Sequence, residues 1–240
     1  MRFCILEADR PAEAFQPDHG TYAGMFMRWL GPHLPEADFS NVFVAGGEAL
    51  PQPADFDAYL ITGSRAGAYE GHNWIAPFEA FLRKVRAERI PLVGVCFGHQ
   101  IMAQAFDGVV RKSDDGWVIG RQEHSLTPEG ADLFGPSALS ALSFHQDQVI
   151  ELPPGARHLL SNAASPNGGL VYDDFPAMSL QFHPEFQPAY IRDLLVAASG
   201  IRVPAPLAET AMASLDDPLE PDRIAQGVAR FFRSHARVAP

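Results

Sequence analysis

A short apolar run that ends in Gly-Val-Cys-Phe-Gly constrains this fold more than any other feature of the sequence. The run from Pro91 to Val95 is continuous and apolar, as in central parallel strands that are covered on both faces. It leads directly into Cys96, and helical periodicity follows from Gly98 to Phe106. Because a buried strand followed at once by a helix is the repeating unit of parallel α/β folds, we predict that class here.

Strand-like and helix-like segments alternate through the first half of the chain. Arg2 to Leu6, Val42 to Ala45 and Tyr59 to Thr62 read as strands. Apolar residues recur at helical spacing in 22–30 and again from Asn73 to Arg89, where Asn73 is placed to cap the helix. We therefore expect three layers, with a mostly parallel central sheet flanked by helices.

The second half has a different pattern. Short β-like runs broken by Gly, Pro, Asn and Asp fill the stretch from Val109 to Phe186, which predicts a smaller antiparallel or mixed sheet portion. Behind Pro221 the apolar residues recur at helical spacing, and Val203 to Pro221 is interpreted as a connector. We expect one domain over residues 1–240, with a C-terminal helical extension at about 203–240.

Charge and cysteine content exclude several classes of function. The chain carries 18 Lys and Arg against 29 Asp and Glu, a formal net charge of -11 that repels nucleic acid and anionic membranes. Only Cys4 and Cys96 occur, without disulfide or zinc spacing. The apolar stretch before Glu7 is too short for a secretory signal, and no segment reaches the ~20 apolar residues of a membrane span. We expect a cytoplasmic protein.

The turn around Cys96 has the form of a nucleophile elbow. A sharp strand-to-helix turn strains the backbone of the nucleophile, and a side chain at Gly94 or Gly98 would collide with neighbouring backbone. The N-terminus of the following helix favours the thiolate form of Cys96. The alternative is that Cys96 is simply a small buried hydrophobic residue at a strand end.

A second motif supplies a candidate base. Leu180 to Glu185 reads as the end of a strand, in which residues i and i+2 point to the same side. His183 and Glu185 can therefore face one site, while Phe182 and Pro184 face away. A histidine oriented by a carboxylate can take a proton from a thiol and return it to a leaving amine. The alternative is a surface His-Pro-Glu turn.

Together the two motifs resemble the triad-type, class I glutamine amidotransferases. The pattern G-x-C-x-G-H-Q, followed some 80 residues later by F-H-P-E, is matched at Gly94 to Gln100 and at Phe182 to Glu185. The resemblance extends over roughly Asp57 to Phe186 and is closest to free-standing members similar to the amidotransferase domain of GMP synthase. It implies a flavodoxin-like fold and a triad of Cys96, His183 and Glu185.

The resemblance also implies substrate-binding residues. By that resemblance Gln100 contacts the substrate glutamine, and the segment 143–147 lines the glutamine pocket through His145 and Asp147. The alternative for His145 and Asp147 is a solvated loop. No cofactor is implied, and no metal site is predicted because the remaining histidines lack ligand spacing.

The same resemblance assigns an oxyanion hole. Backbone N–H groups of Phe97 and of Gly63 and Ser64 would stabilise the oxyanion. The GMP synthase type carries Gly-Gly-Pro in that loop, whereas 62–67 reads Thr-Gly-Ser-Arg-Ala-Gly, which is closer to the free-standing γ-glutamyl peptidases. This departure leaves the identity of the substrate open.

Three functions are compatible with these residues. The first is hydrolysis of the glutamine side-chain amide through a γ-glutamyl thioester; because no ATP-binding domain is seen in this chain, a separate ammonia-accepting synthase subunit would then be the partner. The second is a γ-glutamyl peptidase that acts alone, and the third is a catalytically idle binding module. Trp74 and Trp117 could line a pocket but are more often core residues, so neither receives a role.

Overall fold

A nine-stranded sheet runs through the middle of the computed structural model, which describes residues 1–235. Its strands, together with the separate pair β5 and β8, are β1 (Arg2–Glu7), β2 (Asp38–Phe43), β3 (Ala58–Ile61), β4 (Leu92–Val95), β5 (Val109–Lys112), β6 (Val118–Leu126), β7 (Leu139–His145), β8 (Asp147–Glu151), β9 (Ala156–Ser161), β10 (Gly169–Tyr172) and β11 (Ala177–Leu180). The α-helices are α1 (Gln16–His19), α2 (Tyr22–Leu30), α3 (Ile75–Ala87), α4 (Phe97–Ala105), α5 (Pro128–Phe134), α6 (Pro188–Ala198), α7 (Ala205–Ala213) and α8 (Pro221–His235). Short 3-10 turns are η1 (Glu13–Phe15), η2 (Gly31–His33), η3 (Pro53–Asp55) and η4 (Ser214–Asp216).

The sheet changes from parallel to antiparallel along its width. Its order is β2-β1-β3-β4-β11-β10-β9-β6-β7. Neighbours from β2 to β11 are parallel, and neighbours from β11 to β7 are antiparallel. Strands β3, β4 and β11 are buried along their whole length, which explains their continuous apolar sequences. Both the parallel part and the antiparallel part predicted from the sequence are confirmed.

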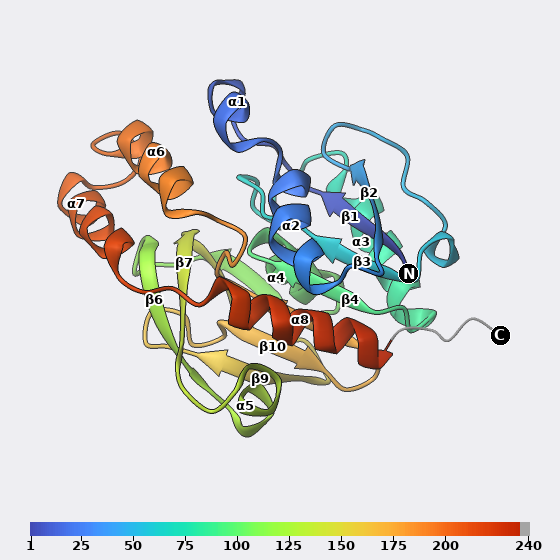
Figure 1. Cartoon of the computed structure of the whole chain (residues 1–240). Coiled ribbons are helices and arrows are strands. Elements are labelled where there is room, and N and C mark those ends of the chain that lie inside the picture. The colour runs from blue at the N-terminus through green and yellow to red at the C-terminus, as the bar shows by residue number, and fades with distance from the viewer. Residues whose placement is uncertain (236–240) are drawn as a thin grey trace.

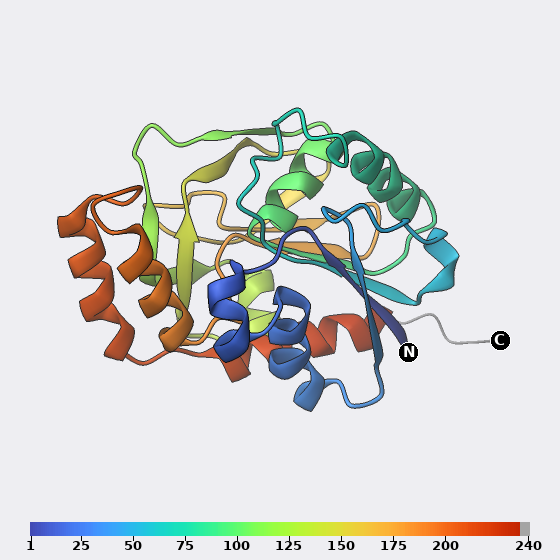
Figure 2. The ribbon, with the colours of Figure 1, turned by 90° about the horizontal axis from the view of Figure 1, so that it is seen from above.

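Helices cover both faces of this sheet, which gives the three predicted layers (Figures 1 and 2). Helices α2 and α8 pack on one face against alternate side chains of β1, including Phe3 and Ile5. Helices α3 and α4 pack on the other face against the intervening residues Cys4 and Leu6. A third apolar cluster lies between α6, α7 and the strands β6 and β7. These residues build the core and leave the carboxyl ends of β1, β3, β4 and β11 for a site.

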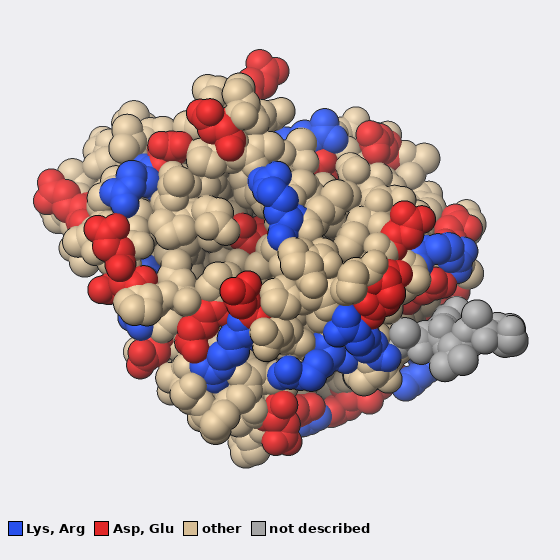
Figure 3. Space-filling model, in the orientation of Figure 1, with Lys and Arg blue, Asp and Glu red and all other residues tan. Residues whose placement is uncertain are grey.

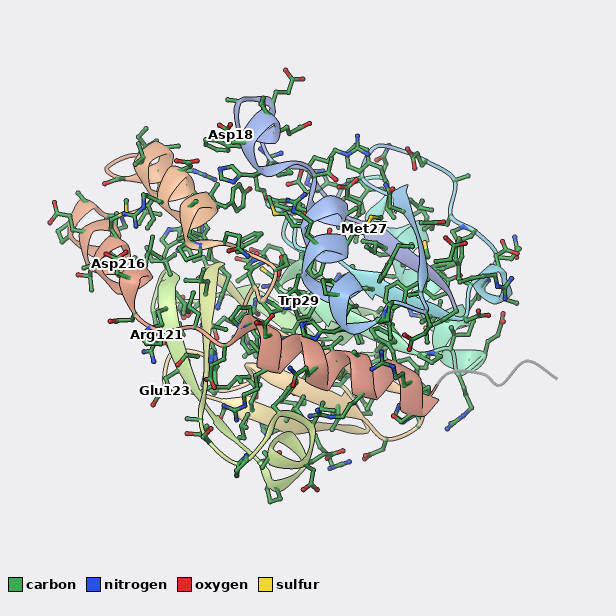
Figure 4. The ribbon with its side chains drawn as sticks, viewed as in Figure 1. Asp18, Met27, Trp29, Arg121, Glu123 and Asp216 are labelled. Atoms are coloured by element: carbon green, nitrogen blue, oxygen red, sulfur yellow. The ribbon has the colours of Figure 1, made fainter. Side chains whose placement is uncertain are left out.

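The C-terminal helix is an integral part of one layer. The ring of Phe232 lies 4.7 Å from that of Phe3, edge to face. Trp29 reaches from α2 to the first residue of α8, where its Nε1–H donates to the Pro221 carbonyl at 2.9 Å (Figure 4). The stretch 203–221 expected as a plain connector instead contains α7 and η4, because its alanine-rich sequence favours a helix. The end of the predicted extension, 236–240, lies outside the described residues.

Two local predictions in the first half of the chain are wrong. The strand expected at Val42 to Ala45 is β2, which ends at Phe43, since 44–47 form a turn. Asn73 does not cap α3; the residue before the helix is Trp74, and it makes no side-chain capping bond. In both cases the element exists and its boundary was misjudged.

Figure 3 shows acidic and basic side chains interleaved over the face that carries α8. Among residues 1–235, no helix is long and apolar enough to cross a membrane.

Candidate active site

Cys96 lies in the sharp turn between β4 and α4. Its backbone has a φ of 53° and a ψ of -103°, a conformation that non-glycine residues rarely adopt. An added Cβ at Gly94 would lie 2.4 Å from the Gly98 carbonyl oxygen, and one at Gly98 would lie 2.6 Å from the Ile61 carbonyl oxygen. The flanking positions therefore have no room for a side chain, as the elbow pattern predicts.

His183 and Glu185 lie together just after β11, which ends at Leu180. The strand end predicted through Glu185 is wrong, because His183 forms only an isolated bridge with Leu142 and residues 184–185 form a turn. The Nδ1–H of His183 donates to Oε1 of Glu185 at 2.8 Å, and both side chains are buried. The His183 backbone N–H donates to the Leu142 carbonyl at 2.7 Å, which ties this segment to β7. The imidazole also stacks on Phe186, with ring centroids 3.9 Å apart and planes 4° apart. Glu185 and Phe186 thus orient the ring, and the backbone bond to Leu142 fixes the position of the residue.

Electrostatics favour a protonated His183. Burial lowers the pKa of His183, but the attraction and side-chain hydrogen bonds of Cys96 and Glu185 outweigh it and raise this pKa from 6.5 to about 10. Cys96 and His183 both lie against Gly63, so the two side chains share one end of the cavity. Because Nδ1 is engaged by Glu185, Nε2 is the ring atom left to face the sulfur. The arrangement suits a thiolate–imidazolium pair.

The loop after β3 approaches both side chains. An ideal Cβ on Gly63 would lie 2.8 Å from Cε1 of His183 and 3.7 Å from Cβ of Cys96. An ion pair holds the loop, because Asp9 accepts from the backbone N–H of Arg65 at 3.0 Å and from its Nε at 2.7 Å. Phe97 is the first residue of α4, so its N–H has no partner within the helix.

Gln100 and Asp147 line the same cavity, and an ideal Cβ on Gly67 of the loop would lie 3.0 Å from Oδ2 of Asp147. The Gln100 Nε2 donates to the Asp147 backbone carbonyl at 2.8 Å and to Oε1 of Gln181 at 3.2 Å. Desolvation raises the pKa of Asp147, and a hydrogen bond from Tyr69 opposes this rise. Gln100 thus positions the backbone of Asp147, and its predicted contact with a substrate stays a prediction.

His145 is buried at the end of β7 and not in a solvated loop. Burial lowers its pKa to about 3, and repulsion from His183 acts in the same direction, so the ring is neutral. Its Nδ1 has no hydrogen-bond partner among the described residues, and its Nε2 lies 3.5 Å from Oγ of Ser165. The segment 143–147 joins β7 to β8, so strand ends hold it.

A cavity of about 310 Å³ opens onto the sulfur. The predicted residues that line it are Gly63, Ser64, Cys96, Gln100, His145, Asp147 and His183. Glu185 lies behind the imidazole, and the Phe97 side chain packs away from the cavity against Trp74, with ring centroids 5.4 Å apart. The structure thus brings the predicted residues to one place.

Several residues at this site were missed by sequence reasoning. Asp9 follows the first strand, and acidic residues at the carboxyl end of a parallel strand are a usable signal. Phe186 follows Glu185 directly, but no sequence pattern indicates that its ring stacks on the imidazole. Nor does any pattern indicate that Tyr69 hydrogen-bonds to Asp147. Trp117 was left unassigned, and it lines the cavity. Among residues 1–235, no cluster of three or more His, Cys, Asp or Glu could hold a metal ion.

Comparison with known proteins gives a consistent result. The profile of the family described as glutamine amidotransferase class-I matches residues 49–199. A glutamine amidotransferase-like protein of Schizosaccharomyces pombe is 28% identical over 95% of this chain and 97% of its own length. Gamma-glutamyl peptidase 5 of Arabidopsis thaliana is 25% identical over 92% of this chain and 90% of its own length.

Two further matches concern GMP synthase and a solved structure. GMP synthase of Bordetella parapertussis is 34% identical over 52% of this chain, and the match spans 24% of that protein. The crystal structure of a glutamine amido transferase from Methylobacillus flagellatus superimposes with a TM-score of 0.78 at 20% identity, covering 100% of this chain and 96% of that one. This structural likeness supports the fold.

Proposed function

This chain belongs to the class I glutamine amidotransferase family, and we propose that it hydrolyses a γ-glutamyl amide with Cys96 as nucleophile. The observation that carries the proposal is the buried His183, bonded to Glu185 and attracted to the sulfur of Cys96. Such a set of groups is suited to nucleophilic attack on an amide followed by protonation of the leaving amine. We place the reaction in the cytoplasm, because reducing surroundings keep the thiol free.

The sequence of steps follows from the positions of these groups. The sulfur attacks the γ-carbonyl carbon, and the N–H groups of Phe97 and of the loop at Gly63 stabilise the oxyanion. The Nε2–H of His183 then protonates the leaving nitrogen as the carbon–nitrogen bond breaks. Water hydrolyses the γ-glutamyl thioester and releases glutamate, and the sulfur and the imidazole recover their original protonation.

Two substrates fit this chemistry. With glutamine the leaving group is ammonia, and a separate synthase protein would consume it. With a γ-glutamyl peptide the leaving group is an amino acid and no partner is required. The second is favoured by the match to gamma-glutamyl peptidase 5 over nearly the whole of both chains, and by the Thr-Gly-Ser-Arg sequence of the oxyanion loop at 62–65.

Hydrolysis assays with matched variants test the proposal. Release of glutamate from glutamine and from γ-glutamyl dipeptides is measured for the parent, for Cys96→Ala and for Cys4→Ala. We expect Cys96→Ala to abolish hydrolysis of every substrate. Cys4 is buried in β1, so Cys4→Ala controls for the loss of a thiol and keeps the activity. Parental activity in Cys96→Ala would overturn the mechanism.

A second variant tests the role of the carboxylate. Glu185→Gln keeps the shape of the side chain and removes one of the two negative groups that raise the pKa of His183. We expect kcat to fall and the pKa of the His183 imidazole to decrease. The imidazole titration is measured by nuclear magnetic resonance of the ring. An unchanged imidazole titration would contradict the assigned role of Glu185.

A further inference from the structure

The position of His183 fixes where the leaving group must lie. The imidazole can protonate a leaving nitrogen only through Nε2, because Nδ1 is held by Glu185 at 2.8 Å. One face of this ring is covered by Phe186. A leaving group larger than ammonia therefore has to occupy the part of the cavity that His183 and Phe186 both line.

That part of the cavity is lined with aromatic rings. Tyr190 contacts Phe186 edge to face at 4.8 Å, and its hydroxyl lies 3.0 Å from that of Tyr22. Farther along, Trp117 and Phe144 meet at 5.4 Å with their planes at 61°. All five residues line the cavity, and they come from α2, α6, the segment between β11 and α6, the turn before β6, and β7.

Trp117 and Phe144 differ from core aromatic residues in their exposure. Both are only partly buried, whereas Phe186, Tyr190 and Tyr22 are buried and support the cavity from behind. Their free surface therefore faces the cavity. Aromatic side chains attract another ring through stacked and edge-to-face contacts.

A cation lies beside these rings. Arg202 is exposed in the turn between α6 and α7, and it lines the cavity. Its backbone carbonyl accepts from Nε1–H of Trp117 at 2.9 Å, so the two residues are tied together. Within residues 1–235 its guanidinium takes part in no ion pair and no side-chain hydrogen bond. A free guanidinium at the rim can bind a carboxylate.

We propose that this region is a leaving-group subsite for an aromatic amino acid, whose ring contacts Trp117 and Phe144 and whose carboxylate faces Arg202. The preferred substrate is then a γ-glutamyl aromatic amino acid, and free glutamine is a poorer one. This inference rests on the proposed function. The reaction balances with water alone: the carbon–nitrogen bond is replaced by a carbon–sulfur bond and then by a carbon–oxygen bond, and the amine leaves with one proton.

The size of the cavity agrees with such a ligand. Pockets that enclose drug-sized ligands have volumes of roughly 300–1,000 Å³. The cavity here, at about 310 Å³, falls in this range. Glutamine would leave the rings of Trp117 and Phe144 uncovered, because its leaving group is ammonia.

The test compares four substrates with the full-length protein. They are γ-glutamyl-phenylalanine, its carboxamide, γ-glutamyl-alanine and glutamine, and kcat/KM is measured for each. We expect γ-glutamyl-phenylalanine to exceed γ-glutamyl-alanine by about 3- to 10-fold, the range given by one good aromatic contact. The carboxamide should fall below the acid by up to about 5-fold, since a partly exposed ion pair contributes little.

Variants locate these preferences. Phe144→Leu and Trp117→Leu should bring the ratio of the phenylalanine substrate to the alanine substrate close to one. Phe39→Leu is the matched control, a partly buried phenylalanine on β2 outside the cavity, and should keep the ratio. Arg202→Ala should remove the difference between acid and carboxamide, whereas Arg192→Ala, which pairs with Asp216 away from the cavity, should keep it.

Two outcomes would overturn the inference, and they are distinguishable. Equal kcat/KM for all γ-glutamyl substrates, or ratios that Phe144→Leu and Trp117→Leu leave unchanged, would remove the subsite while the hydrolase function stands. Hydrolysis no faster than that of Cys96→Ala on all four substrates would remove the proposed function and the subsite with it.

Discussion

Gly63→Ala is the substitution that most directly tests the geometry of the site. Gly63 has no left-handed backbone requirement, so alanine fits the chain and only its methyl group matters. That carbon would lie 2.8 Å from Cε1 of His183. Since carbon–carbon contacts are optimal at about 3.5–4.0 Å, the ring or the loop must move by roughly 0.7 Å.

The expected effect is large for catalysis and small for stability. A misplacement of about 1 Å can cost about 100-fold in rate, so we expect kcat to fall by about 10- to 100-fold. The melting temperature should stay close to that of the parent, because reduced freedom of the unfolded chain offsets part of the strain.

A neighbouring glycine supplies the control. Gly71→Ala lies beyond the same loop, and its methyl group would meet nothing within 4 Å. Steady-state hydrolysis and thermal unfolding are measured for both variants. Full activity in Gly63→Ala, or an equal loss in Gly71→Ala, would refute the argument that the imidazole lies against this loop.

Three further predictions concern stability. Gly94→Ala should destabilise the fold by about 1–3 kcal/mol or more, because its methyl group meets the Gly98 backbone carbonyl; a parental urea midpoint would contradict this. Phe232→Ala should lower the free energy of unfolding by about 3–5 kcal/mol in the same assay. The control Val196→Ala, at an exposed position, should lower it by less than about 0.5 kcal/mol. Burial lowers the pKa of His99 from 6.5 to about 3, so the unfolded chain binds its proton first as the pH falls. This contribution to stability is complete above about pH 6.5 and is lost toward pH 3, at about 1.4 kcal/mol per pH unit. His99→Gln should therefore reduce the dependence of the free energy of unfolding on pH between these values. An unchanged pH dependence would contradict this prediction.

The parts of the fold predicted from sequence are those that a local pattern determines. The buried run 91–95 and the glycines around Cys96 predict a strand, a strained turn and a helix, because a nucleophile elbow requires these elements in this order. The pairing of His183 with Glu185 was predicted from the two-residue period of an extended chain. The two side chains do meet, but through a turn at 184–185 and not through a continued strand.

The parts that could not be predicted depend on distant contacts. No pattern around Phe144 or Trp117 indicates that their rings meet, since that contact depends on the register of β6 with β7 and on the turn before β6. Asn73 has the right chemistry for a helix cap, but the chain turns one residue later, at Trp74. The helix α7 was hidden because its prolines, typical of loops, sit in the first turn, where helices tolerate them.

The central claim is that the Cys96 sulfur is an activated nucleophile in a pocket for γ-glutamyl groups. Its most direct test is the mass of the intact protein after exposure to a glutamine analogue with an electrophilic ketone in place of the amide. We predict one adduct per chain, located at Cys96 by peptide mapping, blocked by excess substrate and slowed in Glu185→Gln. Absence of an adduct, or an adduct at Cys4 instead, would contradict the account.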